Sequence, residues 1–284
     1  MAMTINTNIN SLNAQRNAQA TQMSLSTSIQ RLSSGLRVNS AKDDAAGLAI
    51  ATRMDSQARG MTVAIRNAND GISMLQTAES GMQTVSDMLQ RMRELAVQAT
   101  NSTNTSSDVA SLNQEYTQLA AEIGRTISAV QFNGTSILTT TGSYDFQVGA
   151  NSGQTITVAS GTLNMDQAGN VSATYGAGAA SSLSTAAGTN SANAANIDAI
   201  DKALQTISDS RAQLGAAQSR FQNTINFLQT AVENQTAAKG RIMDADFATE
   251  TANLSRSQIL QQAGTAMIAQ ANQLPQQVLS LLKG

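Results

Sequence analysis

The chain has 284 residues, a formal net charge of −2 at pH 7 and only 13% charged residues. It lacks His, Cys and Trp, so the usual general base, the thiol nucleophile and the commonest zinc ligands are missing, and we expect neither an enzyme nor a bound cofactor or metal. The small charge gives no basic footprint for nucleic acid, and no run approaches the roughly 18 apolar residues that insertion into a membrane needs.

The first segment, residues 5–34, has apolar residues at helical spacing. They lie four and three residues apart in two groups, the pattern of a coiled-coil seam. We expect this seam to contain Ile5, Ile9, Leu12, Leu25, Ile29 and Leu32.

The next stretch, SSGLRVNSAKDDAAGLAIA at 33–51, raises the question of an active site because it holds two glycines and two adjacent aspartates. Asp43 and Asp44 would point about 100° apart on a helix, which does not suit paired catalytic carboxylates. Ser40 and Asp43 instead fit a capping box at the start of a long helix. Gly35 fits a left-handed helix end, and Gly47 would permit close helix packing. The stretch therefore predicts a joint between two helices, not a catalytic or phosphate site.

A long helix is predicted from Ser40 to about Thr100, followed by a turn signal and a second helix from about Asp108 to Val130. The segment LQRMRELAVQ, residues 89–98, lies on the long helix. Its charged residues read most simply as a solvated, salt-bridged face or as a face that bridges neighbouring subunits.

From Phe132 to about Tyr175 the apolar period falls towards two and turn residues abound, as in Phe132-Asn133-Gly134, so short hairpins are expected. Residues 181–194 lie in a low-complexity stretch that resembles a surface connection.

Helical pattern returns at about 195–238 and again at 242–282. The last helix contains Pro275, which should bend it or remove one hydrogen bond. Its expected seam residues are Met267, Leu274, Val278 and Leu281. The predicted fold class is thus mainly α: a long antiparallel helical bundle or coiled coil formed by both chain ends, with a small β-hairpin insert.

The predicted terminal helices are long, but their seams are thin. Helices gain most of their stability from tertiary burial of an apolar face, and such helices would be poorly stabilised in a lone copy. Burial against neighbouring copies explains the stripes better, so the residues themselves favour a homopolymer.

Four blocks carry a resemblance to bacterial flagellin across roughly residues 1–140 and 195–284. They are SSGLRVNSAKDDAAGLAIA (33–51), MRELAVQATN (92–101), QFNG (131–134) and ANLSRSQILQQAGTAMIAQANQLPQQVLSLL (252–282). The resemblance implies a structural subunit that polymerises into the hollow flagellar filament and so serves motility. The hook–filament junction protein of the same apparatus is the alternative, and its matches to the MRELAVQ and SAKDDAAG segments are usually poorer. Some flagellins carry a metalloprotease, but that needs the H-E-x-x-H helix, and this chain has no His.

The resemblance also implies a domain layout. The inner-tube coiled coil would comprise residues 1–45 with 243–284, and the shell domain 46–180 with 195–242. Only the short connection at 181–194 would stand in place of outer domains, which makes this a short flagellin. The stretch at 33–51 would then join the two domains.

Further partners follow from the resemblance alone. The chain would be exported unfolded by the flagellar type III route to the extracellular filament, which agrees with a start that lacks the basic and apolar regions of a cleavable signal. Its partners would be other copies, the flagellar cap, junction proteins, an export chaperone, and host Toll-like receptor 5 and inflammasome sensors. The receptor-binding and inter-subunit patch would comprise Leu89, Gln90, Arg91, Arg93, Glu94, Leu95, Gln98 and Glu115.

Overall fold

The structure is a computed structural model. It describes residues 8–139, 141–165, 171, 182–184 and 190–283, with side chains at all of these except 160, 161, 190–192 and 274–283. The chain forms two compact units. Unit 1 comprises the described residues up to Ser56 and from Glu233, and unit 2 runs from Gln57 to Val232. Both boundaries of these units fall inside long helices. The domain layout that the resemblance implies, with boundaries at residues 45 and 243, stays a prediction.

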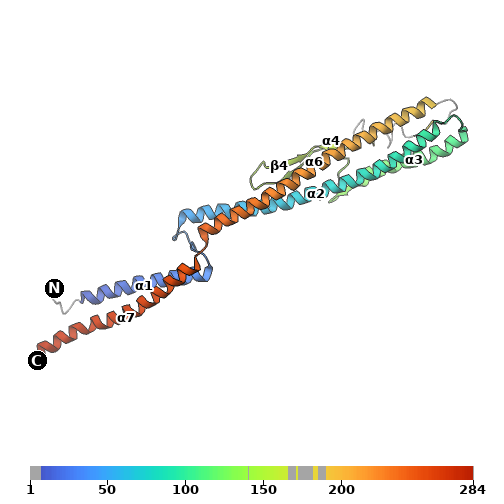
Figure 1. Ribbon diagram of the computed structural model, residues 1–284. Coiled ribbons are helices and arrows are strands. Elements are labelled where there is room, and N and C mark those ends of the chain that lie inside the picture. Colours follow the sequence, from blue (N-terminus) through green and yellow to red (C-terminus); the bar gives the residue numbers. More distant parts are fainter. Residues whose placement is uncertain (1–7, 140, 166–170, 172–181, 185–189, 284) are drawn as a thin grey trace. The chain divides into compact units, whose positions relative to one another are not determined.

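Unit 1 is built on a pair of helices, α1 (Ile9–Ser34) and α7 (Phe247–Lys283), which lie side by side (Figure 1). The pair is antiparallel, because Gln22 bonds to Gln261 near the middle while Ser11 bonds to Asn272 nearer the chain ends. Asn8 caps α1 by accepting a hydrogen bond from the backbone of Ser11. α7 runs through Pro275, which lies among the residues whose side chains are not described.

Unit 2 is a bundle of α2 (Ala45–Ala99), α3 (Ser106–Ala129) and α6 (Asn190–Met243), of which α2 and α6 also extend into unit 1. One apolar core joins the three helices. Residues at turn-related spacing on α2, such as Leu75, Met82 and Leu89, are fully buried in it. α3 starts at a capping box in which Thr105 and Asp108 bond each other's backbone N–H.

Two hairpins pack beside the bundle. β1 (Gln131–Phe132) and β2 (Thr135–Ser136) pair across a two-residue turn, where Asn133 and Gly134 have φ of 49° and 78°. Such turns require positive φ at both positions, which explains the Asn-Gly sequence.

The second hairpin joins β3 (Tyr144–Gln147) to β4 (Thr155–Val158) in antiparallel register and is followed by the short helix α4 (Ser160–Leu163). Ile156 and Val158 are buried while Thr155 and Thr157 are exposed, so the strand has one apolar face. The predicted fold class, mainly helical with a small hairpin insert, is confirmed.

The described part of the expected surface connection is not wholly on the surface. Leu183 is only 3% exposed and belongs to the apolar core. Its backbone N–H donates to Asn113 Oδ1 at 2.7 Å. Helix α6 also begins at Asn190, earlier than the predicted 195. Within the described ranges, no helix combines the length and hydropathy that spanning a membrane requires.

Candidate functional site

The stretch at 33–51 forms a joint held by backbone pairing. Gly35 ends α1 with a left-handed φ of 72°, and its N–H donates to the carbonyl of Arg31. The chain then runs extended beside the segment that follows α6, where Leu36 bridges Asp244 and the N–H of Ala245 donates to Gly35 O at 2.9 Å. The pairing with residues 243–245 has no signal in the local sequence.

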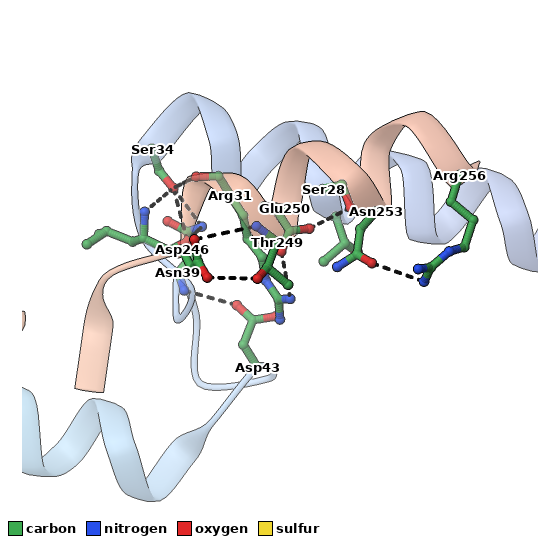
Figure 2. A network of polar contacts seen from close by, with 12 residues as sticks. Ser28, Arg31, Ser34, Asn39, Asp43, Asp246, Thr249, Glu250, Asn253 and Arg256 are labelled. Carbon is green, nitrogen blue, oxygen red and sulfur yellow. Dashed lines mark hydrogen bonds and ion pairs between the residues drawn. The ribbon is translucent and has the colours of Figure 1, made fainter. Parts of the chain in front are cut away.

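The predicted helix start at Ser40 is corrected by the structure. Asp43 does not open the helix; its Oδ2 accepts a hydrogen bond from the backbone of Asn39 (Figure 2). The same oxygen accepts from the backbone and the hydroxyl of Ser40. These bonds, with that of the Ser40 side chain the largest, hold the Asp43 pKa below its usual range. Residues 40–43 form a separate turn, in which the N–H of Asp43 also donates to the carbonyl of Ser40.

Asp44 is the residue that caps α2, because its Oδ1 accepts from the N–H of Gly47 at 2.8 Å. The helix therefore begins at Ala45. A Cβ at Gly47 would collide with the Asp44 carboxylate, so the glycine makes room for the cap and not for a neighbouring helix. Both aspartates thus have structural partners.

The α1/α7 interface differs from the predicted seam. The residues that face the partner helix repeat every three or four positions and are buried or half-buried, but most are small or polar. We call this set the inner seam: Ser11, Ala14, Ala18, Thr21, Leu25, Ser28 and Leu32 on α1, and Glu250, Leu254, Ser257, Gln261, Gly264, Ile268 and Ala271 on α7.

Of the predicted α1 seam residues, only Leu25 and the half-buried Leu32 belong to the inner seam. Ile9, Leu12 and Ile29 are 64%, 51% and 52% exposed. Small side chains pack the two helices instead, so these larger ones are left outside.

The α7 prediction is corrected at Met267, which is 62% exposed. Leu274, Val278 and Leu281 have side chains outside the described set, and Ile5 lies outside the described residues.

The exposed apolar side chains form stripes of their own. On α1, Ile9, Leu12 and Met23 are three and eleven residues apart, close to one and three helical turns. On α7, Leu260 and Met267 are seven residues apart, and Ile259 adjoins them. We call these six residues the outer stripe. Each is at least half exposed within the described chain, so each terminal helix carries one stripe that packs in the chain and one that does not.

An arginine-centred cluster marks the exposed side of α2 in unit 2. Arg91 Nε lies 2.8 Å from Glu115 Oε1 on α3, and Arg91 Nη1 lies 2.9 Å from Glu94 Oε2. These two bonds, the one to Glu115 first, raise the Arg91 pKa further above its already high value.

A second pair borders this cluster on the α6 side. Arg93 donates to Asp201 on α6 at 2.7 Å, which lowers the Asp201 pKa. The cluster of Arg91, Arg93, Glu94 and Glu115 therefore bridges three helices while its side chains stay about half exposed.

Two members of the predicted patch are not on the surface. Leu89 and Leu95 are 0% and 1% exposed and belong to the unit 2 core. They lie on the face of α2 that also carries Met92, and their neighbours in sequence carry the charges. Gln90 and Gln98 are exposed, as expected. The patch that one chain presents is thus polar, and the leucines support it from beneath.

The acidic side chains of the described residues are not gathered into a metal site. Within the described residues there is no group of three acidic side chains placed to hold a metal ion. The polar clusters have structural partners: Asp246, for example, accepts hydrogen bonds from Ala248 and Thr249 and caps α7.

Comparisons with known proteins give the family. The model of the bacterial flagellin N-terminal helical region matches residues 5–143, and that of the C-terminal helical region matches 197–282. The flagellin of Halalkalibacterium halodurans is 46% identical over 282 residues, covering 99% of this chain and 100% of the relative. That of Xenorhabdus nematophila is 42% identical over 313 residues, with full coverage of both.

A crystal structure of Bacillus cereus flagellin covers 61% of this chain and 94% of its own, with 30% identity and a TM-score of 0.48. The two family models together cover most of the chain, and the sequence relatives match it from end to end. The chain therefore belongs to the bacterial flagellin family, and it is a structural subunit of the extracellular flagellar filament, not an enzyme.

Proposed function

We propose that copies of this chain assemble by burying the outer stripe against neighbouring copies. The observation that carries the proposal is the pair of stripes on each terminal helix, one packed in the chain and one exposed. Burying a Leu, Ile or Met side chain contributes roughly 1.5–3 kcal/mol, so six such side chains supply a large driving force for association. The inner seam, made mostly of small residues, supplies much less apolar burial within the chain.

Seeded elongation tests this proposal. Leu12→Asn should slow growth from filament seeds by about tenfold or more, since one lost apolar contact of about 1.4 kcal/mol changes an equilibrium tenfold. Ser26→Asn, at an exposed position on the same helix that belongs to neither stripe, is the matched control and should elongate normally. Equal elongation of both variants, measured by negative-stain microscopy, would exclude a role for the stripe. Failure of the unmodified chain to elongate seeds would instead favour the hook–filament junction alternative.

We also propose that the arginine-centred cluster on α2 and α3 is the face that Toll-like receptor 5 contacts. The supporting observation is that Arg91 and Glu115, both named by the family resemblance, are exposed and held together across two helices. The Arg91 guanidinium donates hydrogen bonds to both glutamates and is fixed by them, so a partner meets a preorganised charged surface. Leu95 is buried, so its contribution is to support the helix and not to touch the receptor.

Receptor signalling by the purified chain tests this assignment. Arg91→Asp should weaken signalling in reporter cells and also impair motility, because the same face would pack between filament subunits. Arg125→Asp is the matched control, since Arg125 is an exposed arginine of α3 that also pairs with a glutamate three residues away. Full signalling by Arg91→Asp would overturn the assignment, whereas equal losses in both variants would point to a general charge effect.

Export by the flagellar type III route remains a proposal that the resemblance motivates. A chain without cysteine has no disulfide to break before threading, which suits transport in the unfolded state. Secretion should stop in a host that lacks the flagellar export gate and continue when general secretion is blocked. The flagellar cap, junction proteins, export chaperone and inflammasome sensors likewise stay predicted partners.

A further inference from the structure

One carboxylate is buried in the inner seam of unit 1. Glu250 is 7% exposed, and its Oε1 accepts a hydrogen bond from the Ser28 hydroxyl at 2.6 Å (Figure 2). Its Oε2 lies 3.7 Å from Arg31 Nη1. The Nε of Arg31 is buried and has no hydrogen-bond partner among the described residues. Burial of such a network costs stability, which makes its presence in the seam informative.

The rest of the inner seam specifies helix register weakly. Ala14, Ala18 and Thr21 are small side chains of this seam, and Gly264 lies against Ala18. Such side chains lack the large knobs and matching holes that fix one register. Gln22 and Gln261 pair at the exposed edge, where long amides can pair with water or with the next polar residue along.

A one-layer slip would move Glu250 away from its partners. If Ala18 faced Gln261, Leu25 would take the place of Ser28 and Ser28 the place of Arg31, so Glu250 would keep a hydrogen-bond donor but lose its cation. If Ala18 faced Ile268, Leu32 and Gly35 would take those places, and both the donor and the cation would be lost. An unpaired buried charge is strongly unfavourable, so these registers are selected against.

We propose that Glu250, held by Ser28 and Arg31, is the positioning residue that sets the register between α1 and α7. A buried polar residue can select one helix pairing at a cost in stability, and this network fits that role. The inference goes beyond assembly between copies, because it concerns the pairing of two helices within one chain. The register in turn decides how the outer stripes of α1 and α7 are aligned with each other.

Thiol pairing in the full-length chain tests the register directly, since the chain has no cysteine of its own. A Cβ placed at Gly264 would lie 3.6 Å from the Cβ of Ala18, within the range of a disulfide. Ala18→Cys with Gly264→Cys therefore reports the observed register. Ala18→Cys with Gln261→Cys, and with Ile268→Cys, report the two slips. The effective concentration of one thiol at the other is obtained for each cysteine pair from its disulfide equilibrium in a glutathione buffer. It is measured both for the dilute soluble chain and for sedimented filaments.

The observed-register pair should exceed both slipped pairs by about tenfold or more in the parent chain. Glu250→Leu should bring the three values close together, because leucine accepts Leu25 or Leu32 as a neighbour. Glu250→Gln, which keeps an acceptor for Ser28, should retain most of the preference. Glu233→Leu, at an exposed position of unit 1, controls for the substitution itself and should leave the ratio unchanged.

Two results would overturn the proposal: an unchanged ratio in Glu250→Leu, or a parent chain without preference in either fraction. A parent chain that keeps its preference but fails to elongate seeds would contradict assembly through the outer stripe and leave the register assignment standing.

Discussion

Gly71 on α2 lies directly against the ring of Phe221 on α6. A Cβ built at Gly71 would meet Phe221 Cζ at 3.0 Å, and Phe221 is itself held edge-to-face by Phe146 at 5.4 Å. The ring is fully buried and cannot easily give way. The glycine is therefore what lets the helix backbone approach an aromatic side chain of the neighbouring helix.

A larger residue at Gly71 should destabilise unit 2, because its side chain would press against the Phe221 ring. Gly71→Ala should lower the free energy of unfolding of unit 2 by about 1–3 kcal/mol, because overpacking a closed core forces side chains off their rotamers. Gly215→Ala is the control: it lies in α6 with open space around it and should stabilise by about 0.5–1 kcal/mol through helix propensity. Urea unfolding followed by circular dichroism measures both, and the reverse order of stabilities would contradict the packing described.

The two kinds of residue in the 89–98 segment should respond differently to truncation. Leu95→Ala should cost about 2–5 kcal/mol of unfolding free energy, because it opens a cavity in the unit 2 core. Arg91→Ala should change stability little, because its ion pairs are exposed to solvent and screened. Thermal unfolding of both variants separates the cases. A stable Leu95→Ala variant would show that the leucine is not a core residue.

Stability should fall at alkaline pH on account of Tyr116. Burial raises the pKa of its phenol above the ordinary value of 10.0, so the folded chain keeps the proton longer than the unfolded chain does. The stabilisation is complete below pH 10 and is lost as pH rises towards the folded pKa. Tyr116→Phe should flatten the decline above pH 10 in a series of urea titrations, and an equally steep decline in that variant would contradict this cause.

The cap of α3 should contribute measurably to unit 2. Thr105→Ala removes the side-chain acceptor for the N–H of Asp108 and should cost about 0.5–2 kcal/mol. Thr105→Ser keeps the hydroxyl and should behave like the parent in the same thermal unfolding experiment. Equal losses in the two variants would place the effect in the threonine methyl group and not in the cap.

Strong local signals predicted local structure well. Phe132-Asn133-Gly134 predicts a hairpin because only a few residues tolerate positive φ at adjacent positions, and the structure has that turn. The apolar spacing along α2 also predicts its buried face, because the apolar residues lie on one side of the helix and that side packs in the core of unit 2.

Sequence features whose meaning depends on a distant segment of the chain did not predict the start of α2 or the packed face of the terminal helices. Ser40 and Asp44 are both acceptable cap residues by type, and only the structure shows that Asp44 accepts from Gly47 while Leu36 pairs with the distant Asp244. Heptad spacing could not tell which stripe of a terminal helix faces the other helix. The larger apolar residues were the obvious candidates, but Ser11 and Ser28 occupy the seam and Leu12 does not.

The mostly small-residue inner seam has a consequence for how the terminal helices respond to dilution. If the outer stripes supply most of the binding, the helices gain most of their stability from other copies, and mass action couples folding to assembly. The melting temperature of unit 1 should then rise with total protein concentration, while that of unit 2, which has its own core, stays fixed. The terminal helices should therefore unfold easily in dilute solution and be stable in the assembled filament, because the same contacts between copies are missing in the first case and present in the second.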